Sequence, residues 1–337
     1  MSRWKFLQNL ILKRDVSAEQ KEISVRRHQG FTLLPCTTRT ETDGSKIQEY
    51  DVFGHQLVFR LHSLGFYRFS MRDKVSLNDI QVAQESKVDN TGNVCVWPSE
   101  EALAYVLCSR AHMLDGKRVL ELGGGMTGMA GLALIKCCGR MTRVVLTDGN
   151  PQVWHVFVQR IQAVDTCTAN LSLNLASENQ ADVASLADLS ASGDDNQRIA
   201  CRLLRWDRSV KYTKPLLPRE QGVTFDFIIV SDCLFFVDYH DDLIHVLSQL
   251  LHPHISGVTL ILGPRRGDSV AKFVRKANAH FMLTQINDYD EVVWSRHLDA
   301  IRTDAHYAPD LHYPVLLVLQ PFTASHRFSW PHDPQTR

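Results

Sequence analysis

The sequence predicts an α/β protein with a doubly wound, mostly parallel sheet of seven strands, preceded by an accessory α+β region. Two apolar runs, at 118–122 and 144–147, have the length of buried strands, and a helical stretch at 127–138 separates them. Glu121 and Asp148 stand near the carboxyl ends of these strands, and a glycine-rich turn follows the first. In open α/β sheets ligands bind beyond the carboxyl ends of the strands. The pattern therefore predicts both the fold and the place of its site.

The predicted elements alternate along the chain. Pro98 with the acidic Glu100 and Glu101 favours the start of the first helix, because carboxylates stabilise the amino end of a helix. Asn150 and Pro151 form an N-cap and N1 pair that opens a further helix. The first helix is predicted at 99–113, and further helices at 127–138, 239–251 and 268–280. The predicted strands are 118–122, 144–147, 200–204, 225–231, 258–262, 283–287 and 315–319. Strands that alternate with helices in this way form parallel sheets.

The accessory region, which we place at 1–90, combines a short amphipathic helix with a β-hairpin. Apolar residues recur at helical spacing within 4–14, with basic residues between them. Segments 56–61 and 67–72 have β-type patterns, and Gly65 between them favours a hairpin turn. We expect the helix to pack on the body of the protein, because one short apolar face anchors poorly to a membrane.

The main α/β domain is placed at 91–322, and a tail follows at 323–337. Within the domain, residues 165–197 are rich in Ala, Ser, Asp and Asn and show no sustained apolar period. Such a composition buries too little apolar surface to order a chain. We therefore expect a polar surface insertion at 165–197 that is partly disordered.

Composition excludes several classes of protein. The chain of 337 residues is 44% hydrophobic and 22% charged, the balance of an ordinary globular protein. Lys+Arg and Asp+Glu both number 37, and without a basic stripe we expect no nucleic-acid partner. The 8 cysteines form no C-x-x-C pair and the 15 histidines show no ligand spacing, which predicts a reducing compartment and no metal site. No apolar stretch reaches the membrane-spanning length of about 18 residues, and the start lacks a signal-peptide core. We expect no membrane partner and a location in the cytoplasm, with the nucleus as a second compartment.

The glycine-rich turn allows two interpretations of its ligand. Gly123, Gly125 and Gly128 fit G-x-G-x-x-G, and Asp148 follows at a distance suited to a ribose hydroxyl, which is the pattern of a dinucleotide site. The carboxylate of Glu121, however, would lie close to a pyrophosphate. The same carboxylate suits S-adenosylmethionine, which carries an ammonium group and no phosphate. The alternative to both interpretations is that the segment binds no ligand and is a glycine-rich turn between buried elements.

Further aromatic and acidic residues follow the strands at the same predicted rim. Trp206 follows the third strand, where its indole either stacks on an adenine ring or packs in the core. Ser231 and Asp232 follow the fourth strand, and Asp232 is either a helix cap or a catalytic residue. Pro98 holds Trp97 in an extended conformation, which aims its indole at the pocket or at the core.

Five segments together carry a resemblance to a known family. They are TGNVCVWPSEE at 91–101, ELGGGMT at 121–127, LRWD at 204–207, SDCLF at 231–235 and LHYP at 311–314. In combination they resemble the family-16 seven-β-strand protein lysine methyltransferases, and within that group the calmodulin-lysine N-methyltransferases. The likeness extends from the amino-terminal helix to about residue 320 and is weakest at 165–197. It implies a Rossmann-like methyltransferase sheet and S-adenosylmethionine as the cofactor.

The resemblance also implies roles for single residues. Those that match family positions in contact with S-adenosylmethionine are Trp97, Glu121, Gly123, Gly124, Gly125, Asp148, Trp206 and Ser231. Within this set Glu121 matches the acid near the amino group of S-adenosylmethionine. Asp148 matches the acid that accepts hydrogen bonds from its ribose hydroxyls. Asp232 to Phe235 match the D-x-x-Y/F signature beside the target lysine, so Asp232 and Phe235 are the catalytic candidates. Two departures stand out. Thr127 replaces a third glycine of many relatives, and Phe235 replaces a tyrosine and removes its hydroxyl.

The function that the resemblance implies is the transfer of methyl groups, up to trimethyllysine, to a lysine of calmodulin. With a pKa near 10.4, only roughly 0.04% of a free lysine is neutral at pH 7. Asp232 would dock and orient the amine, while the sulfonium charge and desolvation lower its pKa and the proton leaves to water. The alternatives are a methyltransferase of another protein lysine or of a small molecule, a NAD-dependent oxidoreductase and a non-catalytic cofactor-binding adaptor. For the oxidoreductase we find neither a nicotinamide half-site nor a proton donor.

The sequence offers two basic patches that could attract an acidic partner. The chain has a formal net charge of +0, so attraction to calmodulin, which is acidic, must come from local patches. Arg265 and Arg266 follow a predicted strand at the same rim as Asp232 and are the stronger candidates. The segment Arg-Arg-His at 26–28 is the other. Ordinary solvated surface is the alternative for both.

Overall fold

The computed structural model describes residues 30–42, 46–61, 96–149, 163–175, 198–216, 222–235, 237–253 and 257–331. Its strands are β1 (Cys36–Thr40), β2 (Lys46–Val52), β3 (His55–Leu61), β4 (Arg118–Leu122), β5 (Arg143–Asp148), β6 (Ile199–Leu203), β7 (Phe227–Ser231), β8 (Val258–Pro264), β9 (Phe281–Ile286) and β10 (Pro314–Pro321). Its helices are α3 (Pro98–Cys108), α4 (Met129–Cys137), α5 (Ala163–Leu175), α6 (His240–Leu250), α7 (Ser269–Ala277), α8 (Glu291–Thr303) and α9 (Pro309–His312), with 3₁₀ turns η3 (Ala111–Met113) and η5 (Val237–Tyr239).

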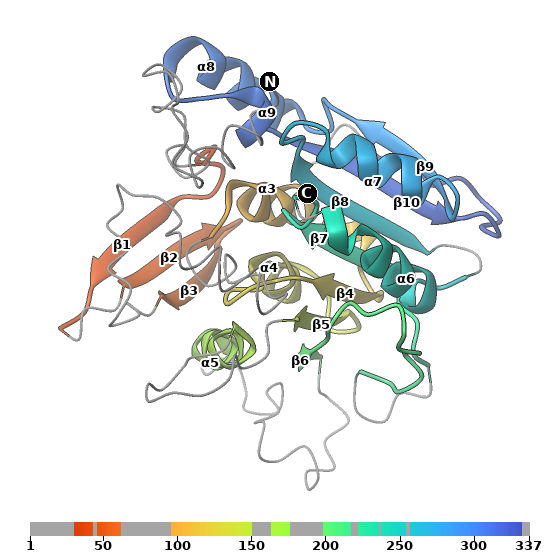
Figure 1. Cartoon of the computed structure of the whole chain (residues 1–337). Helices are drawn as coiled ribbons and strands as arrows, with labels where there is room; N and C mark the ends of the chain where they lie inside the picture. Colours follow the sequence, from red (N-terminus) through yellow and green to blue (C-terminus); the bar gives the residue numbers. More distant parts are fainter. Residues whose placement is uncertain are drawn as a thin grey trace, which may run out of the picture.

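The central sheet has the strand order β6-β5-β4-β7-β8-β10-β9 (Figure 1). Its first five strands in this order are parallel, while β10 is antiparallel to both β8 and β9. The chain moves outward from β4 through β5 to β6 and then returns to β7 on the other side of β4. Such a reversal opens a crevice at the carboxyl ends of the central strands. The prediction of a doubly wound, mostly parallel sheet of seven strands is confirmed.

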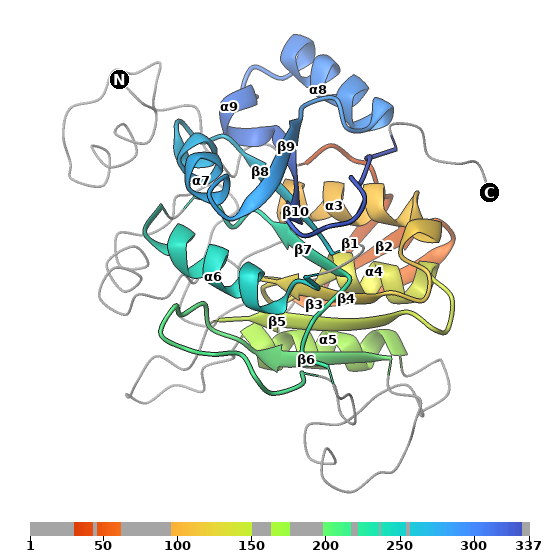
Figure 2. The same ribbon diagram turned by 90° about the vertical axis from the view of Figure 1, so that its right-hand side faces the viewer.

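Helices cover both faces of this sheet. In Figure 1, α3, α4 and α5 lie to the left of the sheet and α6 and α7 to the right, and Figure 2 shows the same layers after a turn of 90°. Because the middle strands are buried on both faces, they are almost continuously apolar. Val119, Leu120 and Leu122 of β4 and Ile228 and Ile229 of β7 have no exposed surface. This packing fixes the carboxyl ends of β4 and β7, and with them the residues that follow.

A separate antiparallel sheet, with the order β1-β2-β3, lies beside α4 and α5 (Figure 1). Phe53 and Gly54 join β2 to β3 with φ angles of 53° and 84°, as a two-residue turn of type I′ requires. The strand predicted at 56–61 is present as β3, and in the described residues it pairs with β2. Gly65 and the strand predicted at 67–72 lie outside the described residues.

Two asparagines of α5 attach the small sheet to the main one. The N–H of Arg60 donates to Oδ1 of Asn170 at 2.8 Å. Asn174 accepts from the N–H of Val58 and donates to its carbonyl, each over 2.7 Å. These bonds occupy backbone groups at one edge of β3, where an open strand would otherwise expose them.

The prediction of a polar, partly disordered insertion at 165–197 is wrong for 165–175. Those residues belong to α5, in which Cys167 and Leu171 are buried against the core. The asparagines that suggested an exposed segment instead bind the backbone of β3. Polarity was therefore a poor guide to exposure here, since side-chain amides can replace backbone partners. Residues 176–197 lie outside the described residues.

A buried ion pair anchors α8, a helix that the sequence analysis missed. Nη1 of Arg110 lies 2.9 Å from Oδ2 of Asp290, and the two side chains are 0% and 1% exposed. Oδ1 of Asp290 caps α8 by accepting from the N–H groups of Val292 and Val293 at 3.0 and 3.1 Å. The Arg110 guanidinium also lies 5.2 Å from the ring centroid of Trp330. One carboxylate therefore both starts the helix and fixes it to the end of α3.

Some expectations fall on residues outside the described ranges. They are the amphipathic helix at 4–14, the basic segment at 26–28 and the helix start at Asn150 and Pro151. Among the helices that the structure does describe, none has the length and apolar character needed to span a bilayer.

Candidate active site

The glycine-rich turn after β4 lies at the crevice between β4 and β7. Gly123, Gly125 and Gly128 have φ angles of 69°, 59° and 52°, in the left-handed region that favours glycine. The N–H of Gly124 donates to the carbonyl of Thr147 in β5 at 3.0 Å. A Cβ added at Gly124 would lie 3.2 Å from Cα of Gly128. The loop therefore closes tightly on itself and is tied to the neighbouring strand.

The loops after β6 and β7 both reach Gly123. A Cβ at Gly123 would lie 2.5 Å from Sγ of Cys233 and 3.4 Å from the indole of Trp206. Trp206 is half-buried, because its ring also packs against the hydrophobic core. The two interpretations of this tryptophan are thus compatible. Its indole belongs to the core and also lies at the loop where the sequence predicted a ligand.

Two more of the expected site residues lie around the same loop. Asp148, at the end of β5, accepts from the N–H of Gly125 through Oδ2 at 3.0 Å. Ser231, at the end of β7, is 7% exposed, and its carbonyl accepts from the thiol of Cys233 at 3.1 Å. Parallel strands thus deliver both residues to one edge of the sheet.

Glu121 lies beneath the glycine loop and is fully buried. Oε2 accepts from the N–H of Gly131 in α4 at 2.8 Å, whereas Oε1 has no hydrogen-bond partner among the described residues. Burial, reinforced by the nearby carboxylate of Glu100, raises the pKa of Glu121 to about 8. A buried acceptor without a donor is costly, so this carboxylate is prepared for a cationic or hydrogen-bonding group.

Glu100 is a second buried carboxylate, and it explains the threonine in the glycine loop. Its Oε1 accepts from the hydroxyl of Thr127 and from the N–H of Met129, the latter at 3.1 Å. Burial, with a smaller contribution from the carboxylate of Asp232, raises the pKa of Glu100 to about 7. Thr127 therefore supplies a hydroxyl that ties the loop to α3.

The sequence analysis gave Glu100 and Glu101 only the role of favouring the helix start. Glu100 does cap the start of α3, because its Oε2 accepts from the N–H of Trp97 at 3.4 Å. Both side chains are also buried and bind other segments of the chain. Glu101 accepts from the N–H groups of Phe31, Leu33 and Leu34 at 3.3, 2.8 and 3.2 Å. It thereby attaches the chain before β1 to α3.

Asp232 forms the other half of the candidate site. Its φ is 52°, and its Oδ2 lies 2.7 Å from Nη2 of Arg266, with the two side chains 10% and 11% exposed. The Arg266 guanidinium lies 5.3 Å from the ring centroid of Phe235 and 5.9 Å from that of Trp97. Burial raises the pKa of Asp232, while Arg266 opposes that rise. One carboxylate, one guanidinium and two aromatic rings thus meet at the end of β7.

The expectation that Arg265 and Arg266 form an outward-facing basic patch is wrong. Arg266 turns inward onto Asp232 and is nearly buried. Arg265 donates to Oδ1 of Asn287 at 2.8 Å. The reason is the register of β7 and β8, in which Ser231 pairs with Leu262 and brings the residues after both strands together.

Comparison with known proteins identifies the family. The lysine methyltransferase family matches residues 76–282 of this chain. A calmodulin-lysine N-methyltransferase from Arabidopsis thaliana is 32% identical over 329 residues, which cover 94% of each chain. The chain belongs to the lysine methyltransferase family. The resemblance carried by the five sequence segments is therefore confirmed.

Solved structures of other methyltransferases show lower similarity to this lysine methyltransferase. An O-methyltransferase from Bacillus cereus in complex with S-adenosylhomocysteine is 13% identical, with a TM-score of 0.38, over 72% of this chain and 89% of the other. A T. thermophilus 16S rRNA N2 G1207 methyltransferase in complex with S-adenosylmethionine and guanosine is 13% identical, with a TM-score of 0.35, over 86% of this chain and 51% of the other.

The cofactor of this lysine methyltransferase is S-adenosylmethionine, and the residues at the crevice fit it. The ligand carries positive charge on its sulfonium and ammonium groups. The three carboxylates of Glu100, Glu121 and Asp232 have raised pKa values and would each be stabilised by a cation. A pyrophosphate would meet the same carboxylates unfavourably, so the dinucleotide interpretation fails. In the ranges that the structure describes, no group of His, Cys, Asp or Glu is arranged to hold a metal ion.

Sequence analysis missed three residues of this site. Glu100 was given only a helix-start role and a place in a motif, Cys233 only a place in a motif, and Arg266 only a role in attracting an acidic partner. A signal for Arg266 was available, because it follows a predicted strand at the same rim as Asp232. The contact itself depends on which strands are neighbours, and a single sequence does not state that order.

Proposed function

We propose that this methyltransferase modifies a lysine side chain of a protein, that calmodulin is the substrate, and that the product extends to trimethyllysine. The substrate follows from the relative that is named for calmodulin-lysine methylation. The observation that carries the chemistry is Asp232 just after β7, paired with Arg266, whose guanidinium lies near the aromatic rings of Trp97 and Phe235. An amine that binds Asp232 would meet its carboxylate in the neighbourhood of these two rings.

On the cofactor side, each residue has a distinct role in this proposal. Glu121 accepts the ammonium group of S-adenosylmethionine at its unpaired Oε1. Asp148 would accept hydrogen bonds from the ribose hydroxyls, and the indole of Trp206 would stack on the adenine ring. Gly123, Gly124 and Gly125 let the ligand approach the backbone, as glycines do elsewhere. Ser231 and Trp97 would complete the set of residues that hold the cofactor.

The acceptor amine must lose a proton before it reacts. Bound S-adenosylmethionine would supply a sulfonium methyl group, which passes to the amine lone pair as the electrons of the C–S bond leave with sulfur. Asp232 orients the amine for in-line attack, a contribution of alignment more than of base strength. Phe235 has no hydroxyl and cannot take the proton, so the proton passes to water. Burial of the site lowers the pKa of the amine and raises its neutral fraction.

The aromatic rings support more than one round of methylation. A lysine that has already received a methyl group loses N–H donors but keeps its positive charge between rounds. Aromatic faces attract such cations without needing a hydrogen bond. Trp97 and Phe235 can therefore hold methylated lysines that Asp232 alone would hold less well.

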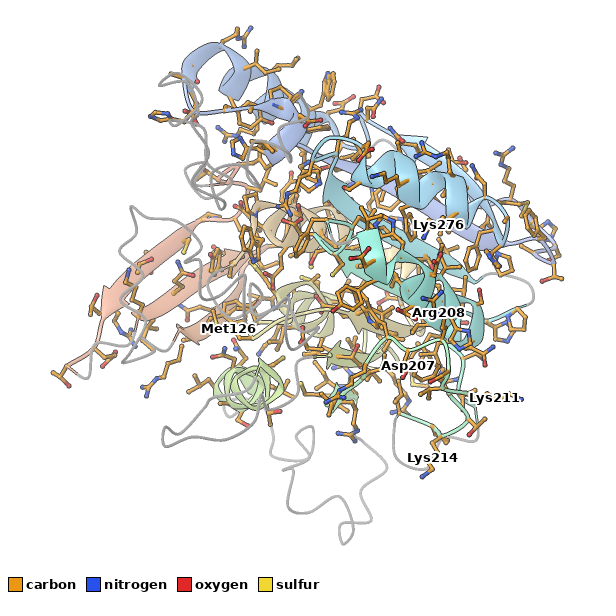
Figure 3. All side chains as sticks on the ribbon, in the orientation of Figure 1. Met126, Asp207, Arg208, Lys211, Lys214 and Lys276 are labelled. Carbon is orange, nitrogen blue, oxygen red and sulfur yellow. The ribbon has the colours of Figure 1, made fainter. Side chains whose placement is uncertain are left out.

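An acidic protein substrate would find basic side chains on the loop after β6. Arg205, Lys211 and Lys214 are exposed there, and Figure 3 shows the two lysines at the outside of the loop. The hydroxyl of Tyr212 fixes this loop by donating to the carbonyl of Arg205 and accepting from the N–H of Asp207 at 3.0 Å. We place the electrostatic docking surface for calmodulin on this loop, in place of Arg265 and Arg266.

The direct test uses recombinant, unmethylated calmodulin and isotope-labelled S-adenosylmethionine. Intact-mass analysis should show the substrate gaining one, two and then three labelled methyl groups in the presence of the enzyme. A parallel reaction with calmodulin whose lysines have been chemically acetylated should show no gain. Transfer to the acetylated protein, or no transfer to either, would rule out lysine of calmodulin as the acceptor.

A further inference from the structure

We propose that Arg266 is a positioning residue for the acceptor amine. It holds Asp232 through one carboxylate oxygen and balances its charge, so that the amine meets the other oxygen without being locked in its protonated form. The inference rests on the proposed lysine methyltransferase function and deepens it. It assigns a role to Arg266 alone and none to the adjacent Arg265.

The geometry holds Arg266 in place from both ends. The carbonyl of Asp310 in α9 accepts from the N–H of Arg266 at 2.7 Å, and its Oδ2 accepts from the N–H of Gly267 at 2.8 Å. At the far end Nη2 reaches Oδ2 of Asp232. In the described residues, Nε of Arg266 is buried and has no partner. The guanidinium is therefore oriented by Asp232 and by the two aromatic rings.

Both members of the pair have an unusual backbone conformation. Arg266 has a φ of 42° and Asp232 a φ of 52°, and neither is glycine. Left-handed conformations at such residues cost free energy and persist where the surroundings enforce them, often at functional sites. The N–H of Asp232 donates to the carbonyl of Leu262 at 2.8 Å, which adds one such constraint. The two strained residues stand at the ends of adjacent strands and face each other.

The chemical need for Arg266 follows from the charge of Asp232. A carboxylate without a partner stabilises the ammonium form of a bound lysine and so raises its pKa, which opposes attack. A guanidinium stays charged at every accessible pH and offsets that effect. It also leaves a carboxylate oxygen available, because its hydrogen bond to Asp232 engages Oδ2 alone. With Arg266 present, Asp232 can orient the amine and raises the pKa of that amine less than an unpaired carboxylate would.

Other charged and titratable groups lie around the pair and must be held constant in a test. Glu100 from α3 interacts electrostatically with Asp232, and Glu121 from β4 interacts with Glu100. Asp310 from α9 binds the backbone at Arg266 and Gly267. His240 from α6 is bonded to the carbonyl of Leu234, and burial lowers its pKa. None of these residues changes when Arg266 is replaced, so a comparison of two substitutions at that position isolates its charge.

The experiment compares Arg266→Gln, Arg266→Lys and the matched control Arg265→Gln. For each, kcat with calmodulin is measured as a function of pH, and the affinity for S-adenosylhomocysteine by calorimetry. We expect Arg266→Gln to keep that affinity within about twofold and to move the pH midpoint of kcat upward by about one unit, which lowers kcat at neutral pH about tenfold. Arg266→Lys keeps a charge and should hold the wild-type midpoint even if folding is weakened, and Arg265→Gln should behave as wild type.

The outcomes separate this role from the proposed function. A wild-type enzyme that methylates no lysine overturns both. With an active wild type, the role of Arg266 alone is overturned by an unshifted midpoint in Arg266→Gln, by an equal shift in Arg266→Lys, or by a lower KM for calmodulin in Arg266→Gln. The last result would mean that the guanidinium blocks the acceptor site and does not position the acceptor.

Discussion

The N–H of Gly125 donates to Oδ2 of Asp148 over 3.0 Å, which joins the glycine loop to the end of β5. The carboxylate expected to hold the cofactor ribose therefore also shapes the loop on which the cofactor rests. A substitution that removes both the loop contact and the ribose hydrogen bonds should weaken cofactor binding more than the loss of the ribose hydrogen bonds alone. The two contributions can be separated, because an amide oxygen can still accept from Gly125.

We predict that Asp148→Ala weakens binding of S-adenosylhomocysteine more than Asp148→Asn does. Each lost charge-assisted hydrogen bond is worth about 1.5–3 kcal/mol, so the alanine variant should lose at least about tenfold in affinity. The asparagine variant should retain the thermal stability of the wild type while still binding more weakly. Isothermal titration gives both affinities. Wild-type affinity in Asp148→Ala would remove this residue from the cofactor site.

Glu100 and Glu121 make stability depend on pH in a defined direction. Their pKa values of about 7 and about 8 lie above the ordinary value of 4.5, so the folded protein keeps protons that the unfolded chain has already released. Between pH 4.5 and about 8 stability should fall as pH rises, because the folded state binds more protons over that window. Below it both states are protonated, and the effect of these carboxylates is constant.

The measurement is the melting temperature from about pH 5 to about pH 9, with and without S-adenosylhomocysteine. Glu121→Gln should flatten the downward slope. In the wild type, ligand stabilisation should grow with pH through the window, since the ligand ammonium pairs with the ionised Glu121. A slope that Glu121→Gln leaves unchanged would show that this carboxylate is not the titrating group.

The basic loop after β6 should govern attraction of an acidic substrate. We predict that Lys211→Glu with Lys214→Glu raises KM for calmodulin several-fold at low salt and weakens its salt dependence, since screening acts over about 8 Å at physiological strength. Affinity for S-adenosylhomocysteine should not change. The matched control reverses Arg140 and Arg327, two exposed arginines outside this loop. An equal effect in the control would assign the change to net charge and not to the loop.

Stability of the α8 end of the molecule should depend on the Arg110–Asp290 pair. Removing one partner of a buried ion pair leaves an uncompensated charge, so Asp290→Ala should lower the free energy of unfolding by about 3–5 kcal/mol. The control is Asp299→Ala, which removes the exposed partner of Arg302 and should cost about 0.5 kcal/mol or less. Chemical denaturation would measure both. Similar losses for the two variants would contradict the importance of burial.

The alternation of strands and helices could be predicted from the sequence because it depends on local apolar patterns. The run before Gly123 and the run that ends at Asp148 each identified a strand, and the turn between them identified the ligand edge. α8 was missed because its buried side is small: Val293 and His297 face the core, while much of the helix is exposed. A weak apolar period gives little signal.

What sequence could not supply were the contacts between distant segments. Whether Glu100 reaches Thr127, or Arg266 reaches Asp232, depends on strand order and on how α3 packs against α4. The position of α5 is a further example. From the sequence its asparagines resemble surface residues, but in the structure they bind the backbone of β3. Local composition describes a residue's chemistry but not its partner.

The central claim is that Asp232 orients a lysine amine of a protein for methylation. Tandem mass spectrometry after a single-turnover reaction with calmodulin tests it most directly, using wild type, Asp232→Asn and the matched control Asp238→Asn, which changes an exposed residue of η5. The account predicts a methyl group on lysine Nζ with wild type and control. It also predicts a rate at least about tenfold lower for Asp232→Asn, together with unchanged affinity for S-adenosylhomocysteine. Methyl groups on another residue type, or a wild-type rate in Asp232→Asn, would contradict it.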